Sequence, residues 1–116
     1  RGSKKIITVT PTQTVMEAIT LMKKYDIENI PVLEAGVIVG AISESGLFSK
    51  ILNDVDIKNQ PIQQIMEKPY PEVSFDTRVE RLSTFITKEN GAVLSKDESG
   101  TYHIVTKYDI IQSLSK

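Results

Sequence analysis

The chain has 116 residues, of which 40% are hydrophobic and 25% are charged, and its formal net charge at pH 7 is −1. These values are ordinary for one globular module, and without a basic stripe they give no support for a nucleic-acid partner. Cysteine is absent, which excludes disulfides and thiolate-bound metals, and the single histidine, His103, excludes a histidine-rich metal site. The apolar runs are too short to cross a bilayer, so we expect a cytoplasmic protein with no membrane partner.

The first predicted elements are a short strand and an amphipathic helix. Residues 1–3, Arg-Gly-Ser, resemble a tag remnant and take no part in the predicted fold, whereas residues 4–9, KKIITV, read as a strand. Thr14 and Glu17 form the Thr-x-x-Glu pattern of a capping box, in which each side chain binds a free backbone N–H. The apolar residues that follow at helical spacing are Val15, Ala18, Ile19 and Met22.

A hairpin and a second helix are predicted next. The apolar runs 30–34 (IPVLE) and 37–43 (VIVGAIS) are joined by Ala35 and Gly36. Two strand-like runs joined by a glycine-bearing pair predict a β-hairpin. Residues 46–52 then read as a helix.

The same order of elements returns in the second half. Residues 72–75 (EVSF) read as a strand, and Thr77 with Glu80 repeats the capping box. The apolar residues of the helix that follows are Val79, Leu82, Phe85 and Ile86. The remaining predicted elements are strands at 91–95 and 101–106, a turn at Glu98-Ser99-Gly100 and a helix at 109–114.

The chain is therefore predicted to contain two repeats with the order β-α-β-β-α, the first at residues 4–56 and the second at 57–116. A unit of about 50 to 60 residues buries too little surface to cover a sheet face alone. We therefore expect the repeats to pack sheet to sheet with pseudo-twofold symmetry, as a mixed α/β (α+β) fold. The polar connector 53–71 contains three prolines and is expected to hold no regular strand, although residues 62–66 fit a helical turn.

Thr106 and Asp109 stand where the last strand passes into the last helix, and two interpretations of them are open. They can simply start the helix, where an acid in the first turn is favourable by about 0.3–1 kcal/mol. Alternatively, they hold a ligand. A capping box prefers Glu or Gln at the acid position, so the shorter Asp109 is expected to point outward. One carboxylate can then accept hydrogen bonds from the two adjacent hydroxyls of a ribose.

Little in the sequence favours an enzyme. There is no cysteine nucleophile and no glycine-rich phosphate loop, and a Ser/His/Asp triad would have to use His103 from within a strand. We therefore expect no catalytic residues, no metal and no cofactor within this chain.

The segments IENIPVLEAGVIVGAIS (27–43) and IVTKYDI (104–110) resemble the two copies of a tandem CBS-domain pair, also called a Bateman module. The segments ERLSTFITKENGAVL (80–94) and KILNDVDIKNQPI (50–62) are similar to the C-terminal regulatory module of cystathionine β-synthase. The resemblance covers essentially the whole chain after residue 3, and two ordered copies make it specific.

The resemblance implies a regulatory module that binds an adenosyl effector in clefts between the repeats, with S-adenosylmethionine favoured and AMP next. It also implies allosteric control of an attached catalytic domain, that of a pyridoxal-phosphate-dependent cystathionine β-synthase, and a homodimer formed through the helices. The alternative is a ligand-free pair that serves only dimerisation or interaction.

On this basis we expect one competent adenosyl site, centred on Thr106 and Asp109, whose carboxylate would hold the ribose. The matching segment of the first repeat keeps a hydroxyl at Ser43 but has Gly46 where the acid would stand. The second site, at Ser43 and Gly46, is therefore expected to be degenerate.

The rest of the competent site is expected from the loop before the first hairpin, Ile27-Glu28-Asn29-Ile30. Ile27 and Ile30 would flank the adenine and Asn29 would hydrogen-bond it, while core packing or a solvated helix end is the alternative role for these residues. Ile27 stands where the family often has an aromatic ring, so Tyr108 is expected to replace part of that contact. Further lining candidates, for which core burial is the alternative, are Ile7 and Ile104.

Charge near the expected site favours a cationic ligand. ATP or ADP would need several cations around the phosphates, and the sequence places only Lys107 and His103 nearby. Glu28 and Asp109 are acidic, which suits a sulfonium better than a polyphosphate. His103 is expected to be structural and is assigned no ligand role.

Overall fold

The computed structural model describes residues 6–88 and 90–114. Residues 1–5, with the predicted tag remnant and the start of the first predicted strand, lie outside the described residues. The chain divides into two compact units. The first is Ile7–Pro69, and the second contains Ile6 and the residues from Tyr70 onward. This division follows the connector, whereas the repeat boundary at 56/57 stays a prediction from the sequence.

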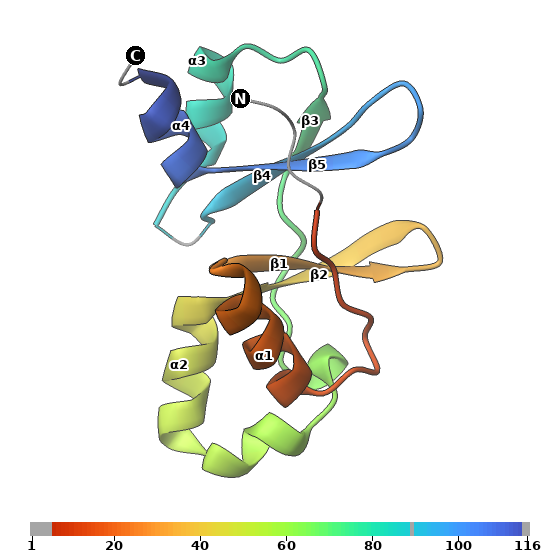
Figure 1. The fold of residues 1–116 in the computed structure, drawn as a ribbon, viewed down its shortest axis with the longest axis vertical. Coiled ribbons are helices and arrows are strands. Elements are labelled where there is room, and N and C mark those ends of the chain that lie inside the picture. The colour runs from red at the N-terminus through yellow and green to blue at the C-terminus, as the bar shows by residue number, and fades with distance from the viewer. Residues whose placement is uncertain (1–5, 89, 115–116) are drawn as a thin grey trace. The chain divides into compact units, whose positions relative to one another are not determined.

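In the first unit a helix, a hairpin and a second helix follow one another (Figure 1). The elements are α1 (Val15–Tyr25), β1 (Asn29–Glu34), β2 (Val37–Ser43), α2 (Glu44–Asn53) and two 3₁₀ turns, η1 (Val55–Asn59) and η2 (Ile62–Gln64). Val9 adds a single parallel bridge to Val32. Among the described residues, the predicted strand 4–9 is therefore reduced to this bridge, in which Leu33 N donates to Val9 O at 2.8 Å.

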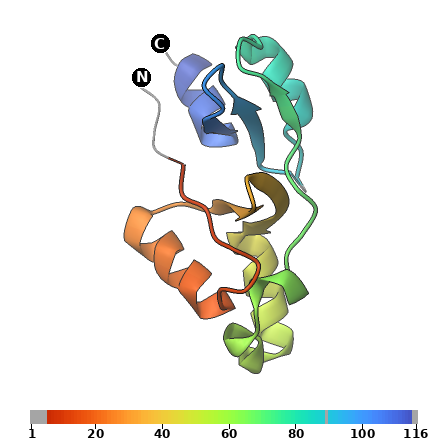
Figure 2. The same cartoon turned by 90° about the vertical axis from the view of Figure 1, so that its right-hand side faces the viewer.

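The second unit repeats that order with a three-stranded sheet. Its elements are β3 (Glu72–Ser74), α3 (Val79–Leu82), η3 (Ser83–Phe85), β4 (Ala92–Lys96), β5 (Tyr102–Thr106) and α4 (Lys107–Leu114). Strand β3 pairs parallel with β4, and β4 pairs antiparallel with β5. In each unit the two helices lie on one face of the hairpin (Figure 2). The predicted α+β fold is confirmed. The second unit has the full β-α-β-β-α order, whereas the leading strand of the first is reduced, among the described residues, to the Val9–Val32 bridge.

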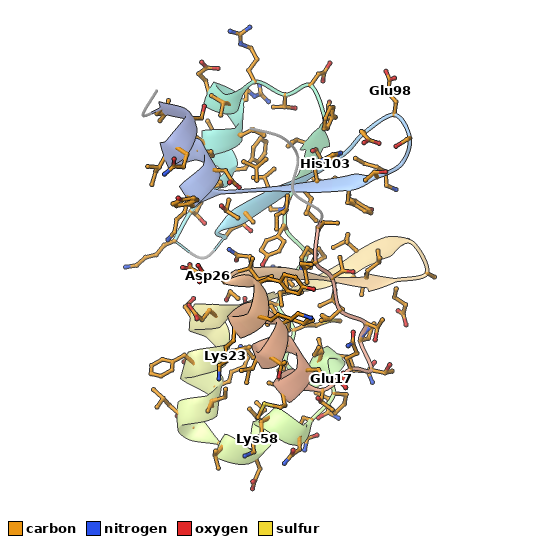
Figure 3. The ribbon with its side chains drawn as sticks, viewed as in Figure 1. Glu17, Lys23, Asp26, Lys58, Glu98 and His103 are labelled. Atoms are coloured by element: carbon orange, nitrogen blue, oxygen red, sulfur yellow. The ribbon has the colours of Figure 1, made fainter. Side chains whose placement is uncertain are left out.

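Helix α1 begins and ends where local chemistry predicts. Thr14 is the N-cap, and its Oγ1 accepts from Glu17 N at 3.2 Å, which satisfies one of the free N–H groups of the first turn. Asp26 ends the helix in the left-handed region at φ 53°, and Lys23 near the last turn complements the helix dipole (Figure 3). The buried side chains of α1 are Val15, Ala18 and Met22. The predicted amphipathic helix is therefore confirmed. Only the Thr14 half of its predicted capping box forms, because the Glu17 carboxylate accepts from Gln13 Nε2 at 3.1 Å instead.

The first hairpin turns at Ala35 and Gly36, as predicted from the sequence. Their φ angles are 52° and 80°, so both central residues adopt the positive φ of a type I′ turn. This turn matches the right-handed twist of the strands it joins, and only the glycine accepts the conformation without steric cost.

The second predicted capping box is wrong. The N-cap of α3 is Arg78, one residue after Thr77, and its side chain makes no capping hydrogen bond. Thr77 N donates to Ser74 O at 3.0 Å, so Thr77 belongs to the turn after β3 rather than to the helix start.

The helix of the second repeat is also shorter than its apolar spacing predicts. It ends at Leu82, and a 3₁₀ turn covers Ser83–Phe85. Ser83 Oγ donates to Glu80 O at 2.8 Å and Thr84 Oγ1 donates to Arg81 O at 2.7 Å. Such hydroxyl bonds compete with the α-helical ladder and tighten the last turn. The apolar residues nevertheless pack as predicted, since Phe85 and Ile86 lie against a core of Leu82, Val93 and Ile110.

Most of the connector, up to Pro69, packs as part of the first unit. Ile62 and Ile65 are buried in the same core as α1 and β1. Glu67 pairs with Ala41 of β2 in an antiparallel bridge, with Glu67 N donating to Ala41 O at 2.8 Å and Ala41 N donating to Glu67 O at 3.0 Å. These two bonds fix the backbone of Glu67 beside the end of β2. The described helices include none that is both long and apolar enough to cross a membrane.

Candidate functional site

The second unit carries a hydroxyl and a carboxylate at the junction of β5 and α4. Asp109 Oδ2 accepts from the backbone N of Thr106 at 3.0 Å and from Thr106 Oγ1 at 3.1 Å. Asp109 N donates in return to Thr106 Oγ1 at 3.3 Å. Thr106 and Asp109 therefore form a reciprocal capping box at the start of α4, and both side chains are half-buried.

The expectation that Asp109 points outward because it is shorter than Glu is wrong. Its carboxylate turns back and closes the capping box. One methylene fewer does not prevent this, because Thr106 ends an extended strand and its N–H already faces the first helical turn. The capping interpretation of the pair is thus confirmed, while its role toward a ligand stays a prediction.

The matching junction of the first unit has the same backbone connections. Glu44 N donates to Glu28 O at 2.9 Å, and the corresponding Lys107 N donates to Gly91 O at 3.4 Å. Ser43 caps α2 as Thr106 caps α4, with Ser43 Oγ accepting from Gly46 N at 3.1 Å. Gly46 is therefore the structural counterpart of Asp109, as the sequence comparison predicts.

The missing acid of the first junction is replaced by a residue that the sequence analysis did not single out. Glu67, from the connector, brings its carboxylate over Gly46. Ser43 Oγ donates to Glu67 Oε1 at 3.3 Å, and Lys50 Nζ lies 3.7 Å from Glu67 Oε2. Because Glu67 is 21 positions beyond Gly46 in the chain, no local spacing could have indicated this contact.

The loop before β1 lies beside the start of α2 in its own unit. The carbonyl of Glu28 accepts from Glu44 N, and Asn29 is the register partner of Ser43. The Ile30 side chain has no exposed surface and belongs to the first unit's core, while Ile27 packs half-buried against that core. Both isoleucines therefore have the alternative role left open for them, which is core packing. Their contact with an adenine stays a prediction.

The remaining predicted lining residues fall in both units. Ile7 lies in the extended segment that leads to Val9, and Ile104 lies in β5 as the register partner of Leu94. Tyr108, in the first turn of α4, is 58% exposed and thus available to a ligand. Thr106, Asp109, Tyr108 and Ile104 are brought together in the second unit, whereas Ile7 and the 27–30 loop belong to the first.

His103 has the structural role that the sequence predicts. Its Nε2 lies 2.8 Å from Asp97 Oδ2, and its ring centroid lies 4.7 Å from that of Phe75. The other carboxylate oxygen of Asp97 accepts from Ser99 N at 2.9 Å and Thr101 N at 3.0 Å, which closes the β4–β5 turn. Figure 3 labels His103 on β5 and Glu98 at the tip of the same hairpin.

These bonds hold the pKa of Asp97 well below its usual range, with the His103 side chain the largest cause. A carboxyl whose pKa is lower in the folded state stabilises the fold above its unfolded pKa, near 4, and loses that effect as pH falls through the folded pKa. The Asp97 contribution should therefore persist well below pH 4. In a carboxyl-carbon NMR titration, His103→Val should raise the pKa of Asp97, whereas Glu98→Gln should leave it unchanged. An unshifted Asp97 in His103→Val would contradict this.

Within the described ranges, no group of three or more His, Cys, Asp or Glu side chains is arranged to hold a metal ion. The polar pairs at the two junctions are capping contacts. Their oxygen atoms are of the kind that can accept hydrogen bonds from a polar ligand.

A family model, described as the CBS domain, matches residues 2–53. The fold of the chain is that of CBS-domain proteins, because the crystal structure of the CBS domain NE2398 superposes with a TM-score of 0.87. That match covers 99% of this chain and 91% of the other at 17% sequence identity. A crystal structure of CBSX2 in complex with AMP superposes with a TM-score of 0.75 at 17% identity, over 95% of this chain and 87% of the other.

Two curated relatives match this chain over almost all of its length. The uncharacterized protein MJ1225 of Methanocaldococcus jannaschii is 28% identical over an alignment of 130 positions, which covers 97% of this chain and 46% of that protein. Cystathionine beta-synthase of Dictyostelium discoideum is 25% identical over an alignment of 118 positions, which covers 97% of this chain and 24% of that protein. The chain thus spans less than half the length of either relative.

Proposed function

We propose that this chain is a regulatory module that binds an adenosyl compound at the start of α4 and thereby controls a catalytic domain attached to it. S-adenosylmethionine is the favoured effector and AMP the next. CBS domains are commonly regulatory modules that sense adenosine-containing ligands, and the similar CBSX2 was crystallised with AMP. The observation that carries the proposal for this chain is the Thr106–Asp109 pair.

The capping box fixes the orientation of the Asp109 carboxylate. Oδ2 accepts from the backbone N–H and the hydroxyl of Thr106. Those bonds hold the carboxylate in one orientation, so a ligand that shares it does not have to immobilise it. Tyr108, exposed one position before Asp109, offers an aromatic surface to the same ligand.

The charges around α4 support S-adenosylmethionine over a polyphosphate. Asp109 is acidic and half-buried, and a carboxylate attracts a sulfonium cation. Lys107 is an exposed cation next to the pair, whereas His103 is engaged by Asp97. One cation and a helix N-terminus can serve the single phosphate of AMP, but the phosphates of ATP call for more.

The parent enzyme and the assembly are parts of the same proposal. The match to a cystathionine beta-synthase favours a pyridoxal-phosphate-dependent catalytic domain before this module. Effector binding would bias that domain, with a coupling free energy of about 1–3 kcal/mol. A homodimer through the helices, and a cytoplasmic location, complete the proposal.

Thermal unfolding with S-adenosylmethionine, AMP, ADP and ATP tests the proposal. An effector present at about 100 times its dissociation constant should add about 2.7 kcal/mol to the unfolding free energy. For a chain of this size that corresponds to a rise of several degrees in Tm. We expect the largest rise with S-adenosylmethionine and the smallest with ATP. No rise with any of the four would reject the sensor and favour a ligand-free module that only mediates dimerisation or interaction.

A further inference from the structure

The carboxylate of Glu67 occupies the place over Gly46 that a side chain at that position would need. A Cβ built on Gly46 would lie 2.5 Å from Glu67 Oε2 and 2.9 Å from Ser43 Oγ. Real Cβ atoms are not found that close to another heavy atom, so any residue other than glycine at 46 requires Glu67 to move. The carboxylate of Glu67 and a side chain at position 46 would therefore occupy the same space.

The backbone of Glu67 is fixed beside the first junction, and its exposed side chain reaches that junction through two contacts. Its two backbone bonds to Ala41 place it beside the end of β2, from which Ser43 caps α2. The side chain then reaches the hydroxyl of Ser43 and the ammonium of Lys50. An acid at the N-terminus of a helix is stabilised by the helix dipole, which favours this arrangement further.

Each junction thus has a hydroxyl bonded to a carboxylate, but the carboxylates come from different places in the chain. In the second unit the hydroxyl of Thr106 meets a carboxylate three residues later, Asp109. In the first unit the hydroxyl of Ser43 meets the carboxylate of Glu67, which comes from the connector. The difference is that Asp109 is carried by the helix it caps, whereas Glu67 reaches in from outside and covers the glycine.

We infer that Glu67 is the residue that closes the first junction to effector, so that the module takes one adenosyl ligand and takes it at Thr106 and Asp109. The carboxylate fills the space and supplies the negative charge at the start of α2, where it excludes a phosphate and replaces the ribose acceptor. This inference rests on the proposed function for its ligand, but the contact itself can be tested without any ligand.

A double-mutant cycle on the full chain tests the contact. Gly46→Asp should lower the Tm, because the new side chain meets Glu67, and Glu67→Ala should lower it by removing the partner of Ser43 and Lys50. The double variant, Gly46→Asp with Glu67→Ala, rebuilds the arrangement of Thr106 and Asp109 within the first unit. We expect its Tm to lie several degrees above that of Gly46→Asp alone.

A matched control separates contact from charge. Glu44 is an exposed acid in the first turn of the same helix, so Glu44→Ala also lowers the negative charge near residue 46. Glu44→Ala should not rescue Gly46→Asp. Additive effects of Gly46→Asp and Glu67→Ala, or an equal rescue by Glu44→Ala, would overturn the inference whatever the ligand does.

Calorimetric titration with S-adenosylmethionine and with AMP tests the consequence. The unmodified chain should bind one molecule, and the double variant should bind two. With Asp109→Ala added, the double variant should still bind one. Two molecules on the unmodified chain, or one on the double variant, would overturn the inference. If the unmodified chain binds neither ligand, the proposed function fails, and the double-mutant cycle alone decides the role of Glu67.

Discussion

Asp109→Ala should remove most of the stabilisation that S-adenosylmethionine confers. The carboxylate is expected to accept from both ribose hydroxyls, and hydrogen bonds to a charged group contribute about 1.5–3 kcal/mol each. Losing them weakens the affinity about 100-fold or more. At a ligand concentration that stabilises the unmodified chain by about 2.7 kcal/mol, the variant should gain about 0.4 kcal/mol or less. Thermal unfolding with and without ligand measures both values.

The same variant also loses a helix cap, so its structural cost has to be measured separately. Without ligand, Asp109→Ala should lower the unfolding free energy by about 0.5–2 kcal/mol. Asp54→Ala is a matched control, since Asp54 Oδ1 accepts from Asp56 N at 3.1 Å and caps η1 in the first unit. It should show a similar structural cost and keep the full ligand effect. A ligand effect preserved in Asp109→Ala would show that the ribose is held elsewhere.

Ile30→Ala should be among the most destabilising single substitutions in the chain. The side chain has no exposed surface and lies in the first unit's core with Val9, Val15 and Met22. Truncating a fully buried isoleucine to alanine removes apolar contacts and leaves a cavity, at a cost of about 2–5 kcal/mol. The Tm of the unliganded chain should fall by about 10 °C or more.

Ile19→Ala provides the comparison, because Ile19 packs against the same core from α1 but is half-buried. The same atoms are removed there with less lost contact, so the fall in Tm should be clearly smaller. Equal effects of the two substitutions in chemical and thermal unfolding would mean that Ile30 does not have the core position described above. Ile30 would then be free for the ligand contact predicted from the sequence.

Elements set by neighbouring residues could be predicted from the sequence. The Thr14 cap, the positive-φ pair Ala35 and Gly36 and the apolar face of α1 are all fixed within a few positions of each other. The second copy of the pattern predicted the hairpin β4–β5 and the helix after it for the same reason. The prediction failed at Thr77 and after Leu82, where hydrogen bonds of Thr77, Ser83 and Thr84 compete with the helix.

The candidate site also has a part that neighbouring residues determine and a part that depends on distant ones. The sequence by itself determined that Thr106 and Asp109 stand together at a strand-to-helix junction, and that the counterpart of Asp109 is Gly46. Only the tertiary structure showed that the space over Gly46 is filled by another carboxylate. The bridge between Glu67 and Ala41 brings a carboxylate from a distant segment onto Gly46. A contact of this kind depends on where the folded backbone passes rather than on the spacing of residues, so no periodicity or local motif could have revealed it.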